Sequence, residues 1–327
     1  MAVLFCFITM LGWGSWINTM KLTKNEDWKF PLYYWDYSIG LVLTALIFGL
    51  SIGSHGEYGR SFLEDLSQAS TVVLGFAFLG GVIFNLSNLL IVAATNIAGM
   101  AVAFPIAVGL ALIIGVVVNY IADPIGNPYL LFFGLLCIVL AIVYNAKAYK
   151  KLPQEKAGNK AKGILLSILS GFLMGFFYRF VAESIAPNFK NPAPELLTPY
   201  SAMFVFTLGI FFSNFIFNTW FMYLPVEGKK VTYTDFFKKG NTRIHLIGIL
   251  GGLIWCTAME FNLIAADKAG FAISYGLGQG ATMVSAAWGV FVWKEFDAAK
   301  RETKPLLTAM FTLFILGLFL IIISRLK

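Results

Sequence analysis

Long apolar stretches separated by short polar connections run through the whole chain. Each stretch approaches the roughly 20 residues that an α-helix needs to cross the hydrocarbon core of a bilayer. Charged residues or clusters of Pro and Gly bound the stretches. They lie at residues 2–20, 36–54, 71–94, 98–122, 128–146, 162–182, 200–223, 244–265, 270–292 and 305–324. The pattern predicts an all-α integral membrane protein with ten transmembrane helices.

The composition leads to the same class of protein. Only 13% of the 327 residues are charged, whereas 58% are hydrophobic and the mean hydropathy is +0.77. A soluble domain carries about 25% charged residues and has no way to bury this much apolar surface. The composition therefore excludes a water-soluble globule. Cys6, Cys137 and Cys256 lie in apolar stretches without metal or redox spacing, so we expect small core residues and no disulfide framework.

The distribution of basic residues predicts the orientation, because Lys and Arg resist translocation. Of the 24 Lys and Arg residues, 18 fall in odd-numbered connections between predicted helices, five in even-numbered connections or at the C-terminus, and Arg179 inside a helix. This bias predicts extracytoplasmic termini in a multi-pass protein of the plasma (inner) membrane. The net charge of +7 then reflects topology and contact with an anionic leaflet of the lipid bilayer, not nucleic-acid binding.

The two halves of the sequence repeat each other at an offset of 171 residues. Leu79-Gly80-Gly81 recurs as Leu250-Gly251-Gly252, and nine of 31 aligned positions are identical. An offset of five helices inverts the second copy, and inverted repeats are typical of secondary transporters with a solute site near the midplane. We therefore predict two inverted five-helix repeats, at residues 1–146 and 162–327, joined by a cytoplasmic linker loop at residues 147–161.

Several motifs resemble known permeases. In the first half, Tyr34-Trp35-Asp36-Tyr37-Ser38, the block from Gly80 to Leu89 and the block from Gly115 to Asp123 resemble the ureide permeases. In the second half, the segment from Ala269 through Gln279 to Glu295 resembles the bacterial glucose/ribose uptake permeases, which share the drug/metabolite transporter superfamily. The resemblance implies ten helices in two inverted halves and a permease that imports a sugar, a ureide or a nucleobase-like solute, often with protons.

We expect the substrate to bind between the two halves at amide and aromatic side chains. Amides offer both donors and acceptors to sugar hydroxyls or ureide ring amides, and Trp rings stack on pyranoses and planar heterocycles. Glycines around Gln279 and a proline at the matching place in the fourth helix interrupt corresponding helices, which points to a transport site. The candidate substrate ligands are Trp13, Trp16, Asn18, Asn85, Asn88, Asn214, Tyr275 and Gln279. Helix packing and interhelical hydrogen bonds are the competing interpretation of the same residues.

Ionisable residues at bilayer depth are the candidates for proton coupling or gating, because each needs a partner, a wet cavity or a function. Glu260 lies deepest in its stretch and is the first choice for a proton site; the alternative is a structural acid bound to a neighbouring helix. Arg179 and Glu183, four residues apart, fit an ion pair that acts as a clamp or an outer gate. Asp36 is interpreted as an N-terminal cap with a possible functional role. Plant ureide permeases carry an acidic residue where this chain has Phe104, which argues against coupling at that position.

Aromatic residues at the start of the second stretch are expected to anchor the protein at the membrane interface. These residues are Trp28, Tyr33, Tyr34 and Trp35.

The sequence favours a secondary active importer of a small, neutral, polar solute, with protons as the coupling ion. No nucleotide-binding loop and no metal-ligand motif is present, so we expect no enzyme activity, no cofactor and no metal. Two alternatives remain open at this point. One is a drug or metabolite exporter of the same superfamily, and the other is a channel or structural membrane subunit.

Overall fold

Apolar α-helices make up the computed structural model, which describes residues 1–55, 59–152, 159–226 and 228–325. Eight helices in this part of the chain are long and apolar enough to cross a membrane. The α-helices are α1 (Ala2–Ser15), α2 (Asn18–Leu22), α3 (Phe30–Leu50), α4 (Ile52–His55), α5 (Phe62–Gln68), α6 (Thr71–Ala98), α7 (Met100–Ala122), α8 (Pro128–Tyr149), α9 (Lys160–Ser184), α10 (Pro199–Asn214), α11 (Phe217–Tyr223), α12 (Tyr233–Lys239), α13 (Thr242–Ala269), α14 (Phe271–Gly278), α15 (Ala281–Ala287) and α16 (Lys300–Ser324).

The first and ninth predicted helices are interrupted. The first ends at Ser15 and resumes as α2, and the ninth breaks at Gln279 and Gly280 before α15 and a π-helical turn at Trp288–Val292. Glycine lowers helix stability, which explains the break in the glycine-rich ninth stretch. The seventh stretch also breaks, between α10 and α11.

The start of α3 corrects two expectations. The helix begins at Phe30, six residues earlier than expected, because Pro31 occupies the first turn, where its missing N–H leaves no bond unmade. Asp36 therefore lies inside the helix and is not its cap. The expected interface anchors are core residues instead: Trp28, Tyr33, Tyr34 and Trp35 are at most 6% exposed because α11, α12 and neighbouring rings pack over them.

Two helices of the same length end in the same way, 171 residues apart. Both α6 and α13 have 28 residues. Gly99 follows α6 with φ 78° and ψ 154°, and Gly270 follows α13 with φ 83° and ψ 152°. Side chains other than glycine rarely adopt this conformation, so each glycine allows a sharp turn into the next helix.

Two pairs of helices also make similar close contacts at glycine. A side chain on Gly40 in α3 would meet the Ile249 carbonyl of α13, and one on Gly209 in α10 would meet the Phe78 carbonyl of α6. Ile249 and Phe78 are separated by the same offset of 171, and Gly40 and Gly209 by 169. Phe84 and Trp255, also 171 apart, touch each other with ring centroids separated by 4.6 Å.

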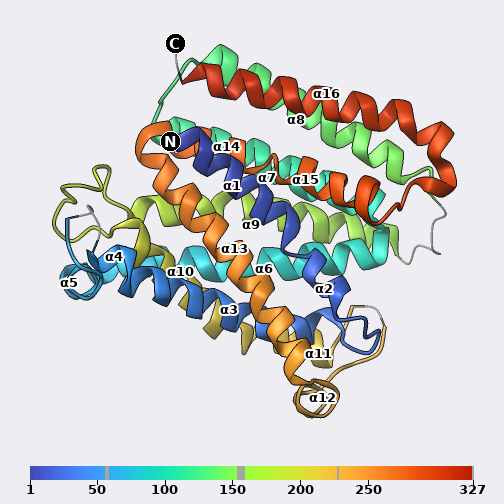
Figure 1. The fold of residues 1–327 in the computed structure, drawn as a ribbon, viewed down its shortest axis with the longest axis horizontal. Helices are drawn as coiled ribbons and strands as arrows, with labels where there is room; N and C mark the ends of the chain where they lie inside the picture. Colours follow the sequence, from blue (N-terminus) through green and yellow to red (C-terminus); the bar gives the residue numbers. More distant parts are fainter. Residues whose placement is uncertain (56–58, 153–158, 227, 326–327) are drawn as a thin grey trace.

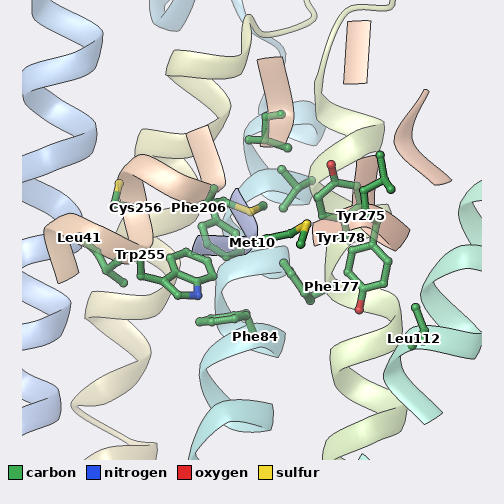
Figure 2. Packing of buried hydrophobic residues seen from close by; sticks show 14 of the residues in the cluster. Met10, Leu41, Phe84, Leu112, Phe177, Tyr178, Phe206, Trp255, Cys256 and Tyr275 are labelled. Atoms are coloured by element: carbon green, nitrogen blue, oxygen red, sulfur yellow. The ribbon is translucent and has the colours of Figure 1, made fainter. Parts of the chain in front are cut away.

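Figure 1 shows the helices lying roughly along one direction, with both termini at the end that carries α4 and α5. The short helices α2, α11 and α12 lie at the opposite end. The helices α8 and α16 pack side by side along one edge of the molecule, where Gly134 and Gly317 each face the other's carbonyl oxygen (Figure 1). The remaining helices surround an aromatic core, part of which appears in Figure 2.

Candidate functional site

A cavity of about 1090 Å³ opens among α1, α6, α7, α9, α13 and α15. Its mouth is lined by the connections that contain Lys29 and Lys229 and by the turn at Gly99. This is the end of the molecule that the basic residues predict to be cytoplasmic. Small-molecule sites commonly occupy about 300–1,000 Å³, so the cavity is large enough for a solute and its water.

Aromatic rings close the inner end of the cavity. Trp13 stacks on Trp255 at 5.9 Å with an interplanar angle of 15°, and Phe84 touches both Trp255 and Phe177. All four residues line the cavity. Figure 2 shows Phe84, Phe177 and Trp255 grouped with Phe206 in the core. This floor offers flat apolar faces to a ring-shaped solute.

Neutral polar side chains line the walls above this floor. They are Asn88, Thr95, Asn96, Asn145, Tyr149, Ser170, Gln279, Thr282 and Ser285. Lys29 and Lys229, both at the mouth, are the charged side chains that line the cavity within the described residues. A lining of amides and hydroxyls binds hydroxyl, carbonyl and N–H groups but gives an ion no counter-charge at the floor.

Four of the eight predicted substrate ligands line the cavity: Trp13, Trp16, Asn88 and Gln279. The Asn88 amide donates to the Tyr34 hydroxyl at 3.1 Å. The Trp13 indole N–H is buried and has no hydrogen-bond partner in the described chain. A buried donor of this kind is costly unless something accepts its hydrogen bond, so Trp13 has an unused donor beside the aromatic floor.

The other four predicted ligands lie outside the lining. Asn85 donates to the Ile210 carbonyl at 3.2 Å and the Ser213 hydroxyl at 2.7 Å, joining α6 to α10. Asn18 accepts from the Trp293 indole at 2.6 Å. Tyr275 donates to carbonyls of α7 and α9 behind the cavity wall. Asn214 is fully buried, and neither of its amide atoms is hydrogen-bonded to a described residue.

Glu260 is fully buried on α13, outside the cavity lining. Neither of its carboxylate oxygens has a hydrogen-bond partner among the described residues. It follows Gly252 and Cys256 at intervals of four residues, and Gly252 packs against the α3 backbone. An unpartnered carboxyl inside the bilayer is costly as an anion.

The remaining candidate gating residues occupy different places. Arg179 and Glu183 form the expected ion pair along α9, away from the cavity lining. Asp36 also lies outside the lining, and its carboxylate contacts His245 Nδ1 at 2.9 and 3.0 Å. His245 lies 209 residues from Asp36, and the sequence gave no signal for this contact.

A buried polar network lies behind the cavity floor and joins α9, α13 and α14. The Tyr178 hydroxyl donates to Asn262 Oδ1 at 2.5 Å and contacts the Ser274 hydroxyl at 2.8 Å. The Asn262 amide also donates to the Ser274 carbonyl at 2.9 Å. A side chain on Gly278 would lie between Asn262 and Trp13, so the network adjoins the cavity wall. Tyr178 was not identified from sequence, because its position in an apolar helix shows no pattern.

Beyond this network, two connections are clamped together at the end opposite the cavity mouth. Arg60 donates to Asp65 Oδ1 at 2.9 Å and to the carbonyls of Pro192, Ala193 and Leu196. The second Asp65 oxygen accepts from both the backbone and the hydroxyl of Thr198. The cavity therefore communicates with one end of the molecule and is closed at the other.

A helical membrane protein with a solute-sized cavity open at one end and lined mainly by neutral side chains has the features of a permease. The sequence profile of the ureide permease family matches residues 33–162 and 155–324, and the chain belongs to this family. It is 24% identical to Ureide permease 1 of Arabidopsis thaliana over 381 residues, covering 99% of this chain and 96% of the relative. It is 22% identical to the protein named Putative sugar uptake protein YxfA of Lactococcus lactis subsp. lactis over 333 residues, covering 99% of both chains.

Proposed function

We propose that this protein is a secondary active transporter that imports a small, neutral, polar solute of the sugar or ureide class. The observation that carries the proposal is the cavity, which combines an aromatic floor with amide and hydroxyl walls. Relatives named for ureides and for sugar uptake match nearly the whole chain, so both substrate classes stay in the proposal. Trp13, Trp16, Asn88 and Gln279 are the proposed ligands.

The proposed architecture has ten membrane crossings in two inverted halves, residues 1–146 and 162–327. The matching glycine turns after α6 and α13, the matching glycine contacts of α3 and α10, and the Phe84–Trp255 contact all support a two-fold relation. The linker at 147–161 lies in part outside the described residues. The inverted relation explains how one fold opens to either side of the membrane in turn.

The proposed location is the plasma membrane, and the proposed orientation places both termini outside the cytoplasm. The connections rich in Lys then lie at the cavity mouth, so the structure corresponds to a conformation open to the cytoplasm. The clamp of Arg60 and Asp65 and the network of Tyr178, Asn262 and Ser274 close the opposite side. In this arrangement the Arg179–Glu183 pair belongs to the closed half of the protein.

Glu260 is the proposed proton-coupling group. Its buried carboxyl lacks a partner among the described residues, which favours the protonated form while the cavity faces this side. It lies apart from the cavity lining, so the proton and the solute occupy different places.

The test uses purified protein in proteoliposomes. A panel of sugars, allantoin and nucleobases is first screened for thermal stabilisation, because a bound ligand shifts the folding equilibrium. For the best ligand, Glu260→Gln is expected to abolish accumulation driven by a pH gradient but to spare solute exchange. Glu302→Gln, which changes an exposed acid paired with Lys151, is the matched control. Unchanged accumulation by Glu260→Gln contradicts the coupling role, and the absence of saturable, trans-stimulated exchange in the wild type contradicts the transporter.

A further inference from the structure

The contact between Asp36 and His245 joins α3 to α13 at the end of the molecule where the cavity opens. Both Asp36 oxygens lie within 3.0 Å of His245 Nδ1. The Asp36 side chain is 3% exposed, whereas that of His245 is 27% exposed. Within the described residues, His245 is the side chain that makes hydrogen-bond contacts with the Asp36 carboxylate. Neither residue lines the cavity, so the proposed solute site leaves the pair without a role.

Aromatic rings enclose the imidazole on two sides. The Trp28 ring meets it edge-on at 5.3 Å, and the Phe236 ring of α12 lies at 4.7 Å. Water therefore reaches the carboxylate by way of the exposed part of the imidazole. A carboxylate and an imidazole in hydrogen-bond contact can share one proton, and the half-buried imidazole of this pair lies at the end of the molecule where the cavity opens.

Other ionisable groups around the pair have partners of their own or are exposed. On α3, the Tyr33 hydroxyl contacts the Thr19 hydroxyl at 2.7 Å. On α12, hydrogen bonds from the Thr232 hydroxyl hold the pKa of Asp235 below its ordinary value, and Asp235 also pairs with Lys239 at 3.0 Å. Arg243 donates to the Leu22 carbonyl at 3.4 Å.

Beside Trp28, Asp27 and Lys29 are exposed. Around the buried carboxylate, the described residues thus leave the Asp36–His245 contact as the place where an added proton is held.

Protonation changes the strength of the contact. With a proton on the imidazole, the pair is an ion pair in a poorly hydrated place; without it, a nearly buried carboxylate is left with a neutral partner. A proton therefore stabilises the conformation in which α3 and α13 are joined here, which is the conformation with the cavity open at this end.

We propose that Asp36 and His245 together bind one proton from the cytoplasm, and that this proton holds the transporter in its cytoplasm-open conformation. The inference rests on the proposed function and adds to it a regulatory proton site separate from Glu260. Cytoplasmic acidification, which proton-coupled import itself produces, would then slow the return of the empty carrier.

The experiment measures solute exchange at equal pH on both sides of the membrane, so no proton gradient contributes. Exchange by the wild type is expected to be at least threefold slower at pH 5.5 than at pH 7.5. His245→Gln keeps a hydrogen-bond donor for Asp36 but removes the titration, and Asp36→Asn removes the charge; both are expected to flatten this dependence. The double variant should show no further change, because the residues act as one unit. His55→Gln, at the opposite end of the molecule, is the matched control.

Three results separate the possible failures. If the wild type shows no saturable exchange at any pH, the proposed function fails. If exchange is present and His245→Gln retains the wild-type pH dependence, the proton site is overturned while the transporter stands. The third result is wild-type exchange that is faster at pH 5.5 than at pH 7.5, with this dependence lost in both variants. It overturns the assignment of the protonated pair to the cytoplasm-open conformation. The melting temperature of each variant shows that it is folded.

Discussion

The unused indole N–H of Trp13 allows a test that separates ligand binding from protein stability. Trp13→Phe keeps an aromatic ring beside Trp255 and removes the N–H that has no partner in the described chain. If this donor meets a solute oxygen, its loss weakens binding by about 0.5–1.5 kcal/mol, the net worth of one neutral hydrogen bond. That range corresponds to an affinity about 2- to 12-fold lower.

The same substitution has two opposing effects on the ligand-free protein. Removing an unsatisfied buried donor relieves a desolvation penalty of about 1–3 kcal/mol. Replacing the larger indole by a phenyl ring leaves a small void, which costs a similar amount. We therefore expect the ligand-free melting temperature to change little. At a ligand concentration of about 100 times the wild-type Kd, the stabilisation falls from about 2.7 to about 1.4 kcal/mol for a tenfold loss of affinity.

Trp28→Phe is the matched control for this experiment. The Trp28 indole N–H is also buried without a partner among the described residues, but Trp28 lies outside the cavity lining. We expect both variants to change ligand-free stability alike and only Trp13→Phe to lose affinity. Equal affinities for Trp13→Phe and the wild type, measured by thermal shift and by exchange kinetics, would refute the proposal that Trp13 binds the solute.

Three further predictions follow from the packing. Asn88→Ala is expected to raise the KM for exchange several-fold, because Asn88 lines the cavity. Asn85→Ala should leave KM unchanged but lower the unfolding free energy by about 1 kcal/mol, the typical net contribution of an interhelical hydrogen bond. Gly252→Ala should destabilise the protein by about 1–3 kcal/mol in thermal unfolding, since a side chain there meets the Tyr37 carbonyl, while Gly75→Ala, which faces open space, should be neutral or stabilising. Tyr178→Phe removes one hydroxyl from the network of Tyr178, Asn262 and Ser274. If the closed side loses about 1 kcal/mol of stability, an impermeant maleimide should label Cys6, kept as the sole cysteine, about fivefold more. Unchanged labelling would show that the network does not hold this side closed.

The sequence predicted the positions of the helices better than their ends. It predicted a solute site between helices better than the contacts of the individual side chains. Apolar length identified each helical stretch, because spanning a bilayer sets a strong requirement on composition. It misplaced the start of α3, because the aromatic residues around Pro31 resemble an interface belt, whereas Trp28, Tyr33, Tyr34 and Trp35 are buried in the core. Whether an amide faces solute or a neighbouring helix depends on tertiary packing. Asn85 and Asn88 are three residues apart on one helix, yet Asn85 joins α10 and Asn88 lines the cavity.

Two of the contacts missed from sequence join distant segments. His245 lies 209 residues from Asp36, and Asn262 lies 84 residues from Tyr178. Periodicity describes one helix at a time, so it carries no information about which helices become neighbours.

The contact of Phe84 with Trp255 has a consequence for the transport cycle. Under the proposed inverted repeat, Phe84 and Trp255 are equivalent residues, and their contact lies where the two halves meet. In the proposed transport cycle, the two halves exchange conformations about this contact to give the state open to the other side. The loop bend at Gly270, now packed against Ile125, would then border the entrance from outside, as the bend at Gly99 borders the present one.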